Sequence, residues 1–299
     1  MLKTKEEKTF QIFANIIMAI FAVAAVIPVI LLVISSFTSN DALVKNGYSF
    51  IPTEWSLENY EYVFLSGNKI VNAYGISFLL TAVGTVVGTV ITTALGYAIS
   101  RSDLPGVKVI TFLVFFTMLF NGGLVPTYMN YSNVFQVKNT FWGLLIPSLL
   151  MNAFNVMLVK SYFKTGVPDE ILEAARIDGA GELRTFYSIA VPMARPIIAT
   201  IAMFVGIMYW NDWNNGYIYI TSATNLYSIQ NLLNRMQQNI QFLVQNTAGL
   251  TSANVGLASI PTEGVRMAMA VLGVVPIVAI YPFIQNNFVK GITLGGVKG

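Results

Sequence analysis

The stretch Ile12–Ile34, IFANIIMAIFAVAAVIPVILLVI, contains no charged residue. A helix crosses the hydrocarbon core of a bilayer with about 20 predominantly apolar residues. This stretch exceeds that length, it is too long for the apolar part of a signal peptide, and no convincing Ala-x-Ala cleavage site follows it. We therefore expect a retained membrane-spanning helix near the start of the chain.

The composition of the whole chain is that of a membrane protein. Hydrophobic residues make up 55% and charged residues 10% of the 299 residues, whereas charged residues approach about a quarter of a soluble domain. The sequence has no Cys and no His, which excludes disulfides, thiol nucleophiles, His-ligated metals and Ser-His-Asp triads. The net charge of +3 is small and scattered, so we expect no nucleic-acid partner.

Five further stretches meet the length requirement, so the sequence predicts an all-α membrane protein with six transmembrane helices, near residues 12–37, 74–100, 109–131, 140–163, 196–221 and 266–289. With the N-terminus inside, eleven of the 17 Lys and Arg residues fall in the inner segments, which favours cytoplasmic termini. We expect a cytoplasmic N-terminus at 1–11, a transmembrane domain at 12–289 and a cytoplasmic tail at 290–299. The transmembrane domain contains a cytoplasmic loop at 164–195 and a long external loop at 222–265.

The second predicted span has small residues at every fourth position: Gly84, Gly88, Thr92 and Gly96. Residues four apart lie on one face of a helix, and small side chains let a neighbouring helix approach closely. We interpret this stripe as a packing seam rather than as a site of chemistry.

The most informative stretch lies in the loop 164–195. Pro168 suits the first turn of a helix, the acidic residues after it complement the positive helix N-terminus, and Gly179 suits the C-terminal cap. At 100° per residue, the apolar side chains of this short helix share one arc: Ile171, Leu172, Ala174 and Ala175. The pattern by itself fits a helix that docks on another protein and an ordinary interfacial helix about equally.

The order Glu173-Ala174-Ala175, then Asp178-Gly179, Ile189 and Pro192, resembles the EAA loop of permease subunits in bacterial ATP-binding-cassette (ABC) importers. Val191 stands where Leu is commonest. The whole chain resembles the carbohydrate branch that includes the maltose permeases, and two stretches look most like permeases for complex oligosaccharides such as aldouronates: NGGLVPTY at 121–128 and YWNDWN at 209–214.

This resemblance implies the type I ABC importer permease fold, with a cytoplasmic coupling helix in which Glu173, Ala174, Ala175, Asp178, Gly179 and Pro192 transmit ATPase movement. It implies a heterodimer with a second, related permease, two cytoplasmic ABC ATPase subunits, an extracytoplasmic solute-binding protein and the bacterial plasma membrane. No G-x-x-x-x-G-K-[ST] phosphate loop is found in the sequence, so we expect no ATPase activity in this chain, with ATP and Mg bound by the partner.

Polar and aromatic residues within the predicted spans are candidates for a sugar pathway: Asn121, Tyr128, Asn152, Asn155, Trp210, Asn211, Asp212 and Asn214. Amides pair with sugar hydroxyls, and aromatic rings pack on the apolar faces of pyranoses. For the group at 209–217, an interfacial aromatic belt with bridging Asn side chains is an equally good interpretation. For Asn152 and Asn155, helix–helix contact is favoured.

Three alternatives remain from the residues. An ion-gradient-driven secondary transporter usually shows inverted repeats and intramembrane acids, but only Asp212 qualifies. An intramembrane enzyme is disfavoured because His, Cys and paired intramembrane carboxylates are missing. An ABC importer permease for a solute other than a sugar also fits the loop 164–195.

Overall fold

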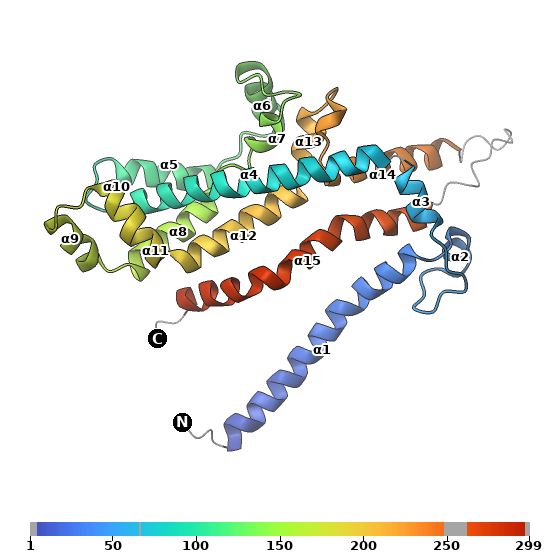
Figure 1. Ribbon diagram of the computed structural model, residues 1–299, viewed down its shortest axis with the longest axis horizontal. Coiled ribbons are helices and arrows are strands. Elements are labelled where there is room, and N and C mark those ends of the chain that lie inside the picture. Colours follow the sequence, from blue (N-terminus) through green and yellow to red (C-terminus); the bar gives the residue numbers. More distant parts are fainter. Residues whose placement is uncertain (1–4, 66, 248–261, 297–299) are drawn as a thin grey trace. The chain divides into compact units, whose positions relative to one another are not determined.

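A computed structural model describes residues 5–65, 67–247 and 262–296, and these are almost entirely helical (Figure 1). The chain divides into two compact units. The first comprises residues 1–68 and 235–276, and the second comprises residues 69–234 and 277–299. The prediction of an all-α chain is confirmed.

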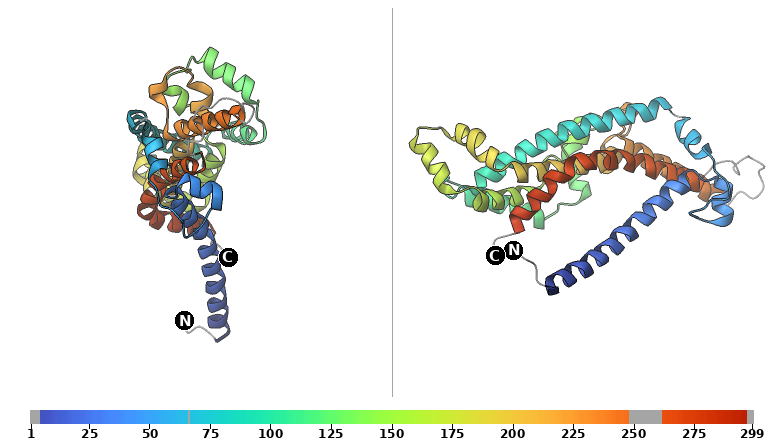
Figure 2. Two further views of the ribbon diagram at one scale, coloured as in Figure 1. Left: turned by 90° about the vertical axis from the view of Figure 1, so that its right-hand side faces the viewer. Right: turned by 60° about the horizontal axis from the view of Figure 1, so that its bottom comes forward.

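The first unit contains α1 (Lys5–Ser36), α2 (Asn40–Asn46), α3 (Glu58–Phe64) and parts of α14 (Ile229–Thr247) and α15 (Thr262–Gly296). Helix α1 is continuous in every view (Figure 2), and most of its apolar side chains from Phe10 to Val33 are exposed, as expected of a helix in lipid. Asn59 is fully buried and donates through Nδ2 to the carbonyls of Ser36 (3.1 Å) and Thr38 (2.8 Å). This amide therefore joins α3 to the end of α1.

The second unit is built around α4 (Gly67–Ser100), α8 (Ala153–Gly166) and α12 (Arg195–Asn211). It also contains α5 (Val107–Leu119), α6 (Leu124–Met129), α7 (Trp142–Leu145), α9 (Asp169–Ile177), α10 (Glu182–Thr185), α11 (Val191–Met193) and α13 (Asn214–Tyr219). A hydrophobic core that includes Leu80, Val159 and Ile201 joins the three central helices.

The small-residue stripe of α4 is a packing seam, as predicted. A Cβ at Gly84 would overlap the ring of Tyr209 on α12, and one at Gly96 would lie 2.5 Å from the side chain of Val159 on α8. Gly88 faces the backbone carbonyl of Leu150 and the side chain of Val205. The absence of side chains at these positions is what lets α8 and α12 pack directly on α4.

Within the described residues, three helical segments are long and apolar enough to cross a membrane, by length and composition only: 8–36, 67–100 and 263–280. Two bent pairs raise the number to as many as five if each pair is one span. They are Val107–Leu119 with Leu124–Val134, bent by 120°, and Glu182–Met193 with Arg195–Asn211, bent by 83°. The number of six spans stays a prediction.

Three of the predicted spans are not single continuous helices. The 109–131 helix bends between α5 and α6, where Gly123 has a φ of 86°. The 140–163 helix is divided into α7 and α8 around Ser148, whose φ is 62°. The 196–221 helix ends at Asn211, because the carboxylate of Asp212 accepts backbone N–H groups of Asn214 (3.2 Å) and Asn215 and so caps a new helix, α13.

The expectation that 222–265 is a long loop is wrong for its central part, which forms the 19-residue helix α14. The segment is polar overall. However, its few apolar side chains recur at helical spacing, and Ile229, Leu233 and Ile240 are buried. Residues 248–261 of the predicted loop lie outside the described residues.

Candidate functional site

The predicted coupling helix is α9, and its ends follow from local sequence. Pro168 lies just before the helix rather than in its first turn, and Asp169 and Glu170 occupy the first turn. At the other end Gly179 has a left-handed φ of 80°, its N–H bonds to the carbonyl of Arg176 (2.9 Å), and the next N–H bonds to the carbonyl of Ala175 (2.9 Å). This pair of bonds is a Schellman cap, which glycine permits at no steric cost.

The apolar arc of α9 is divided between two surroundings. Leu172 and Ala175 are buried, 5% and 7% exposed, and Leu172 joins the hydrophobic core of the second unit beside Phe163 and Val167. Ala174 is exposed and Ile171 is 40% exposed. Ala174 and Ala175 therefore do not share one exposed face: Ala175 packs on this chain itself, on the side of the helix that Leu172 anchors.

The outer side of α9 remains accessible in this chain. Four of the predicted coupling residues are exposed, namely Glu173, Ala174, Asp178 and Gly179, and so is Ile177 (86%). Pro192 lies in α11 and is half-buried. Figures 1 and 2 show α9, α10 and α11 together at the C-terminal end of α4.

A buried arginine connects this group of helices to α4. Arg101, the residue directly after α4, has a side chain that is 6% exposed. Its guanidinium donates two hydrogen bonds to the carboxylate of Asp103 (2.8 and 2.6 Å) and two to Glu182 of α10 (2.8 and 3.2 Å). A fifth goes to the hydroxyl of Tyr97 (3.0 Å). We call Tyr97, Arg101, Asp103, Arg176 and Glu182 the arginine clamp.

Arg176 adds a link from α9 to the arginine clamp. Its guanidinium lies 3.5 Å from the carboxylate oxygens of both Asp103 and Glu182. The two forked carboxylate contacts of Arg101 fix its planar guanidinium in position and orientation. Arg176 contacts the same two carboxylates, so the end of α4, α9 and α10 are linked through them.

The charges of the arginine clamp stabilise one another. Hydrogen bonding to Arg101 lowers the pKa of Asp103 to about 2 and lowers the pKa of Glu182. The hydrogen bonds from Asp103 and Glu182 in turn raise the pKa of Arg101. All three side chains are therefore ionised throughout the physiological range of pH.

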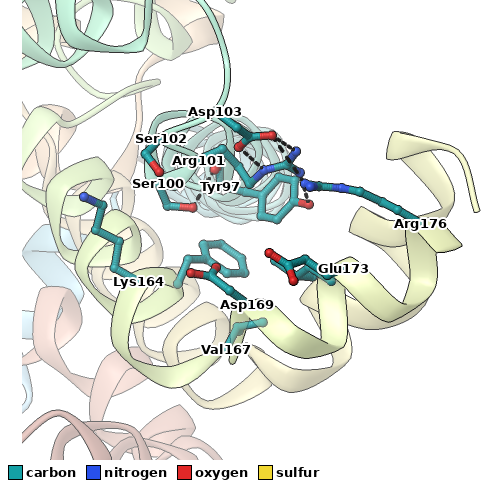
Figure 3. Close-up of a pocket in the computed structure, with 12 residues that line it drawn as sticks. Tyr97, Ser100, Arg101, Ser102, Asp103, Lys164, Val167, Asp169, Glu173 and Arg176 are labelled. Carbon is teal, nitrogen blue, oxygen red and sulfur yellow. Dashed lines mark hydrogen bonds and ion pairs between the residues drawn. The ribbon is translucent and has the colours of Figure 1, made fainter.

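A pocket of about 310 Å³ lies between the C-terminal end of α4 and α9 (Figure 3). Asp169, Glu173 and Leu172 of α9 line one side, and Arg101 and Ser102 line the opposite side. Figure 3 shows the carboxylates of Asp169 and Glu173 at the α9 wall. The predicted coupling residue Glu173 thus has a cavity beside it that can receive a side chain.

The predicted pathway residues near α12 do not form one face. Trp210 is buried (4% exposed) and packs against the ring of Phe78 at 5.2 Å between centroids. Asp212 caps α13, whereas Asn211 and Asn214 are exposed at the helix break. Asn211 and Asn214 are three positions apart and would share a face of a continuous helix, but the break at Asp212 removes that arrangement.

The remaining pathway residues have mainly local partners. Asn121 accepts from the N–H of Gly123 (2.9 Å), and Asn152 caps α8 by accepting from the N–H of Asn155 (3.1 Å). Asn155 is buried, and its Nδ2 has no hydrogen-bond partner among the described residues. Tyr128 of α6 is half-buried and stacks on the ring of Tyr219.

Sequence reasoning missed the most strongly connected polar residues. The arginine clamp joins Arg101 to Glu182 across 81 positions, and neither belongs to a motif that we singled out. Asn215, which donates to the carbonyls of Leu144 (3.3 Å) and Pro147 (2.8 Å), was missed as the link between α13 and α7. The one signal in the sequence was the position of Arg101 directly after an apolar span, where a charged residue can bind a partner from another segment.

An all-helical chain with apolar helices of spanning length defines a polytopic membrane protein, and its relatives specify the class. No model of a protein family matches the chain. The chain is 33% identical to the polygalacturonan/rhamnogalacturonan transport system permease protein YtcP of Bacillus subtilis over 98% of this chain and 100% of that protein. It is 32% identical to the protein LplC of the same organism over 100% of this chain and 98% of that protein.

A solved structure supports the same assignment. The chain matches a chain of a bacterial ABC transporter involved in the import of the acidic polysaccharide alginate, with a TM-score of 0.76, 26% identity, and coverage of 96% of this chain and 99% of that chain. The chain belongs to the family of permease subunits of ABC carbohydrate transport systems.

Proposed function

We propose that the chain is the permease subunit of a binding-protein-dependent importer that moves an oligosaccharide into the cytoplasm, driven by ATP hydrolysis on a separate subunit. The transport systems named for its relatives handle polygalacturonan or rhamnogalacturonan and alginate, which supports a sugar oligomer as the solute. A second permease, two ATPases and a solute-binding protein complete the proposed assembly. The chain itself binds no cofactor in this proposal, and ATP and Mg belong to the ATPase.

The observation that carries the proposal is the construction of α9. One side of the helix is anchored in the hydrophobic core by Leu172 and tied to α4 through Arg176 and the arginine clamp. The other side, with Ala174 and Asp178, is exposed. A helix that is rigidly fixed on one side and free on the other can transmit the movement of a docked subunit to the spanning helices.

The proposed membrane topology has both termini in the cytoplasm of a bacterial cell, with α9 on the same side. In this arrangement residues 1–11 and 290–299 are cytoplasmic, and 12–289 form the six-span domain. ATPase closure on α9 then shifts the permease between inward-facing and outward-facing states, because the docked ATPase binds the two states with different affinity. For the sugar pathway we retain Asn121, Tyr128, Asn155 and the exposed amides Asn211 and Asn214 as candidates.

The test is ATP-driven uptake by the complete complex in proteoliposomes. Glu173→Lys or Gly179→Asp is expected to leave membrane insertion intact and to separate ATP hydrolysis from uptake. Glu61→Lys, a charge reversal at an exposed position of α3, is the matched control. Normal coupled uptake in both α9 variants contradicts the proposed role of this helix. Uptake by this chain alone on a cation gradient, without ATP, would contradict the importer assignment.

A further inference from the structure

A short segment after α6, residues 136–139, has an unusual backbone conformation. Gln136 and Asn139 both have left-handed φ values, 53° and 57°, although neither is glycine. Such a conformation costs about 1 kcal/mol or more per residue and persists only where the surroundings enforce it. Two such residues flanking a two-residue stretch indicate that the position of Val137 and Lys138 is tightly determined.

The surroundings that enforce this conformation come from three directions. The N–H of Val137 donates to the carbonyl of Tyr131 (3.1 Å), and the N–H of Asn139 donates to the carbonyl of Tyr219 at the end of α13 (2.9 Å). The carbonyl of Val137 packs against Gly143, where a Cβ would lie 2.5 Å from it. The segment is therefore held at once by the helical turn Asn130–Val134, by α7 and by α13.

The side chain of Asn139 completes this fixation. Its Oδ1 accepts from the backbone N–H groups of Thr221 (2.7 Å) and Ser222 (2.9 Å), directly after α13. An oxygen with two backbone donors has little freedom to move. Lys138 thus extends from a preorganised turn and not from a loose loop.

Lys138 itself is exposed, and its ammonium donates to the phenol oxygen of Tyr128 (3.1 Å). Among the side chains that the structure describes, no carboxylate lies within ion-pair distance of it. An ammonium has three N–H donors, so at least one remains for a ligand. The charge of Lys138 is positioned but not neutralised.

The phenol that holds Lys138 belongs to a cluster of aromatic rings. Tyr128 stacks on Tyr219 with centroids 6.0 Å apart and an interplanar angle of 21°, and Tyr131 meets Tyr219 edge-on at 6.1 Å. The ammonium lies 5.8 Å from the centroid of the Tyr128 ring. The site thus places a fixed cation next to half-buried tyrosine rings. Such rings can pack on the apolar C–H face of a pyranose while the cation binds a negative group on the same sugar.

We propose that Lys138, with Tyr128 and Tyr131, forms a subsite for the carboxylate of a uronate residue in the transported oligosaccharide. The ammonium pairs with the sugar carboxylate, and the tyrosine rings contact the sugar ring that bears it. Lys138 lies in the predicted external segment 132–139, and Tyr128 and Tyr131 lie at the adjoining end of the predicted span 109–131, on the side from which the solute enters. This inference rests on the proposed import function and deepens it, because it assigns negative charge to the cargo.

The experiment compares a galacturonate trisaccharide with its carboxyl methyl ester, which has the same rings and no charge. Uptake is measured in proteoliposomes with the complete complex containing wild-type chain, Lys138→Gln or Lys138→Arg. Gln retains hydrogen bonding without charge, and Arg retains the charge. Lys69→Gln removes another exposed lysine of the same unit and is the matched control.

We expect Lys138→Gln to raise the concentration for half-maximal uptake of the trisaccharide about threefold to fivefold, the upper part of the range for an exposed charge pair. The ester, the Arg variant and the Lys69→Gln control are expected to stay within about twofold of wild type. Increased salt is expected to narrow the difference between wild type and Lys138→Gln, because ions screen an exposed pair.

Binding of the trisaccharide to the detergent-solubilised complex without its solute-binding protein is measured in parallel, since that protein can reject the ester by itself. Equal affinity of wild type and Lys138→Gln in this measurement overturns the inference. Equal losses for acid and ester also overturn it and indicate a structural or lipid-contacting lysine. A wild-type complex that moves only the ester refutes the subsite alone, whereas one that moves no saccharide refutes the proposed function and the subsite with it.

Discussion

Removing the charge of Arg101 is expected to release α9 and α10 from α4. Breaking one side of a fully buried ion pair costs about 3–5 kcal/mol, and an exposed pair contributes about 0–1 kcal/mol. The Arg101 side chain is 6% exposed, but its partners Asp103 and Glu182 are 50% and 57% exposed. An intermediate cost of about 2–3 kcal/mol for Arg101→Gln is therefore expected.

Hydrogen exchange measures this cost where it arises. A loss of 2–3 kcal/mol corresponds to a roughly 30- to 160-fold larger opening equilibrium for the amides that depend on the arginine clamp. In the nucleotide-free complex, peptides covering residues 169–185 should lose protection by that factor, while peptides in the middle of α4 should not change. Arg184→Gln, an exposed cation of α10 outside the arginine clamp, is the control.

A double-mutant cycle separates the arginine clamp from general loss of structure. Glu182→Gln is expected to cost less than Arg101→Gln, because Asp103 still holds the guanidinium. The two changes together should cost about 1–2 kcal/mol less than their sum, as for contacting residues. Unchanged protection of residues 169–185 in Arg101→Gln, or strict additivity in the cycle, would refute the view that this arginine fixes α9 to α4.

Two further predictions concern the helix seam and pH. Gly84→Ala is expected to lower the thermal midpoint of the purified complex, at a cost of about 1–3 kcal/mol, because the added Cβ overlaps the ring of Tyr209. That ring is fixed by a hydrogen bond to the carbonyl of Leu145 (2.7 Å). Gly67→Ala, with open space around it, is the control, and equal midpoints for Gly84→Ala and wild type would show that the seam relaxes. Because the pKa of Asp103 is lowered to about 2, its contribution to stability is fully present above about pH 4 and is lost only towards pH 2. Protection of residues 169–185 from hydrogen exchange, corrected for intrinsic exchange, should therefore be equal at pH 5 and pH 8. A loss of protection at pH 5 would show that the carboxylates of the arginine clamp titrate there.

Local chemistry made several elements predictable. The Schellman cap at Gly179 depends on one residue that tolerates a positive φ, so the end of α9 could be assigned from the sequence. The seam on α4 depends only on periodicity, and Gly84 and Gly96 pack as expected. Periodicity alone missed the helix break at Asp212, because in the sequence a carboxylate that caps a new helix cannot be told from any other polar residue within a span.

The chain's composition and its apolar runs determined by themselves that it is a helical membrane protein, since a bilayer requires long internally hydrogen-bonded apolar helices. The loop around Glu173 also identified its class. Only the tertiary structure decided that Ala175 faces inward, that Arg101 reaches Glu182, and that Lys138 stands over a tyrosine cluster without a carboxylate partner among the described side chains. Some of these contacts join residues that are far apart in the chain, and the others depend on which side of a helix packs against the rest of the protein. Local spacing in the sequence specifies neither which distant residues meet nor how a helix is rotated about its axis.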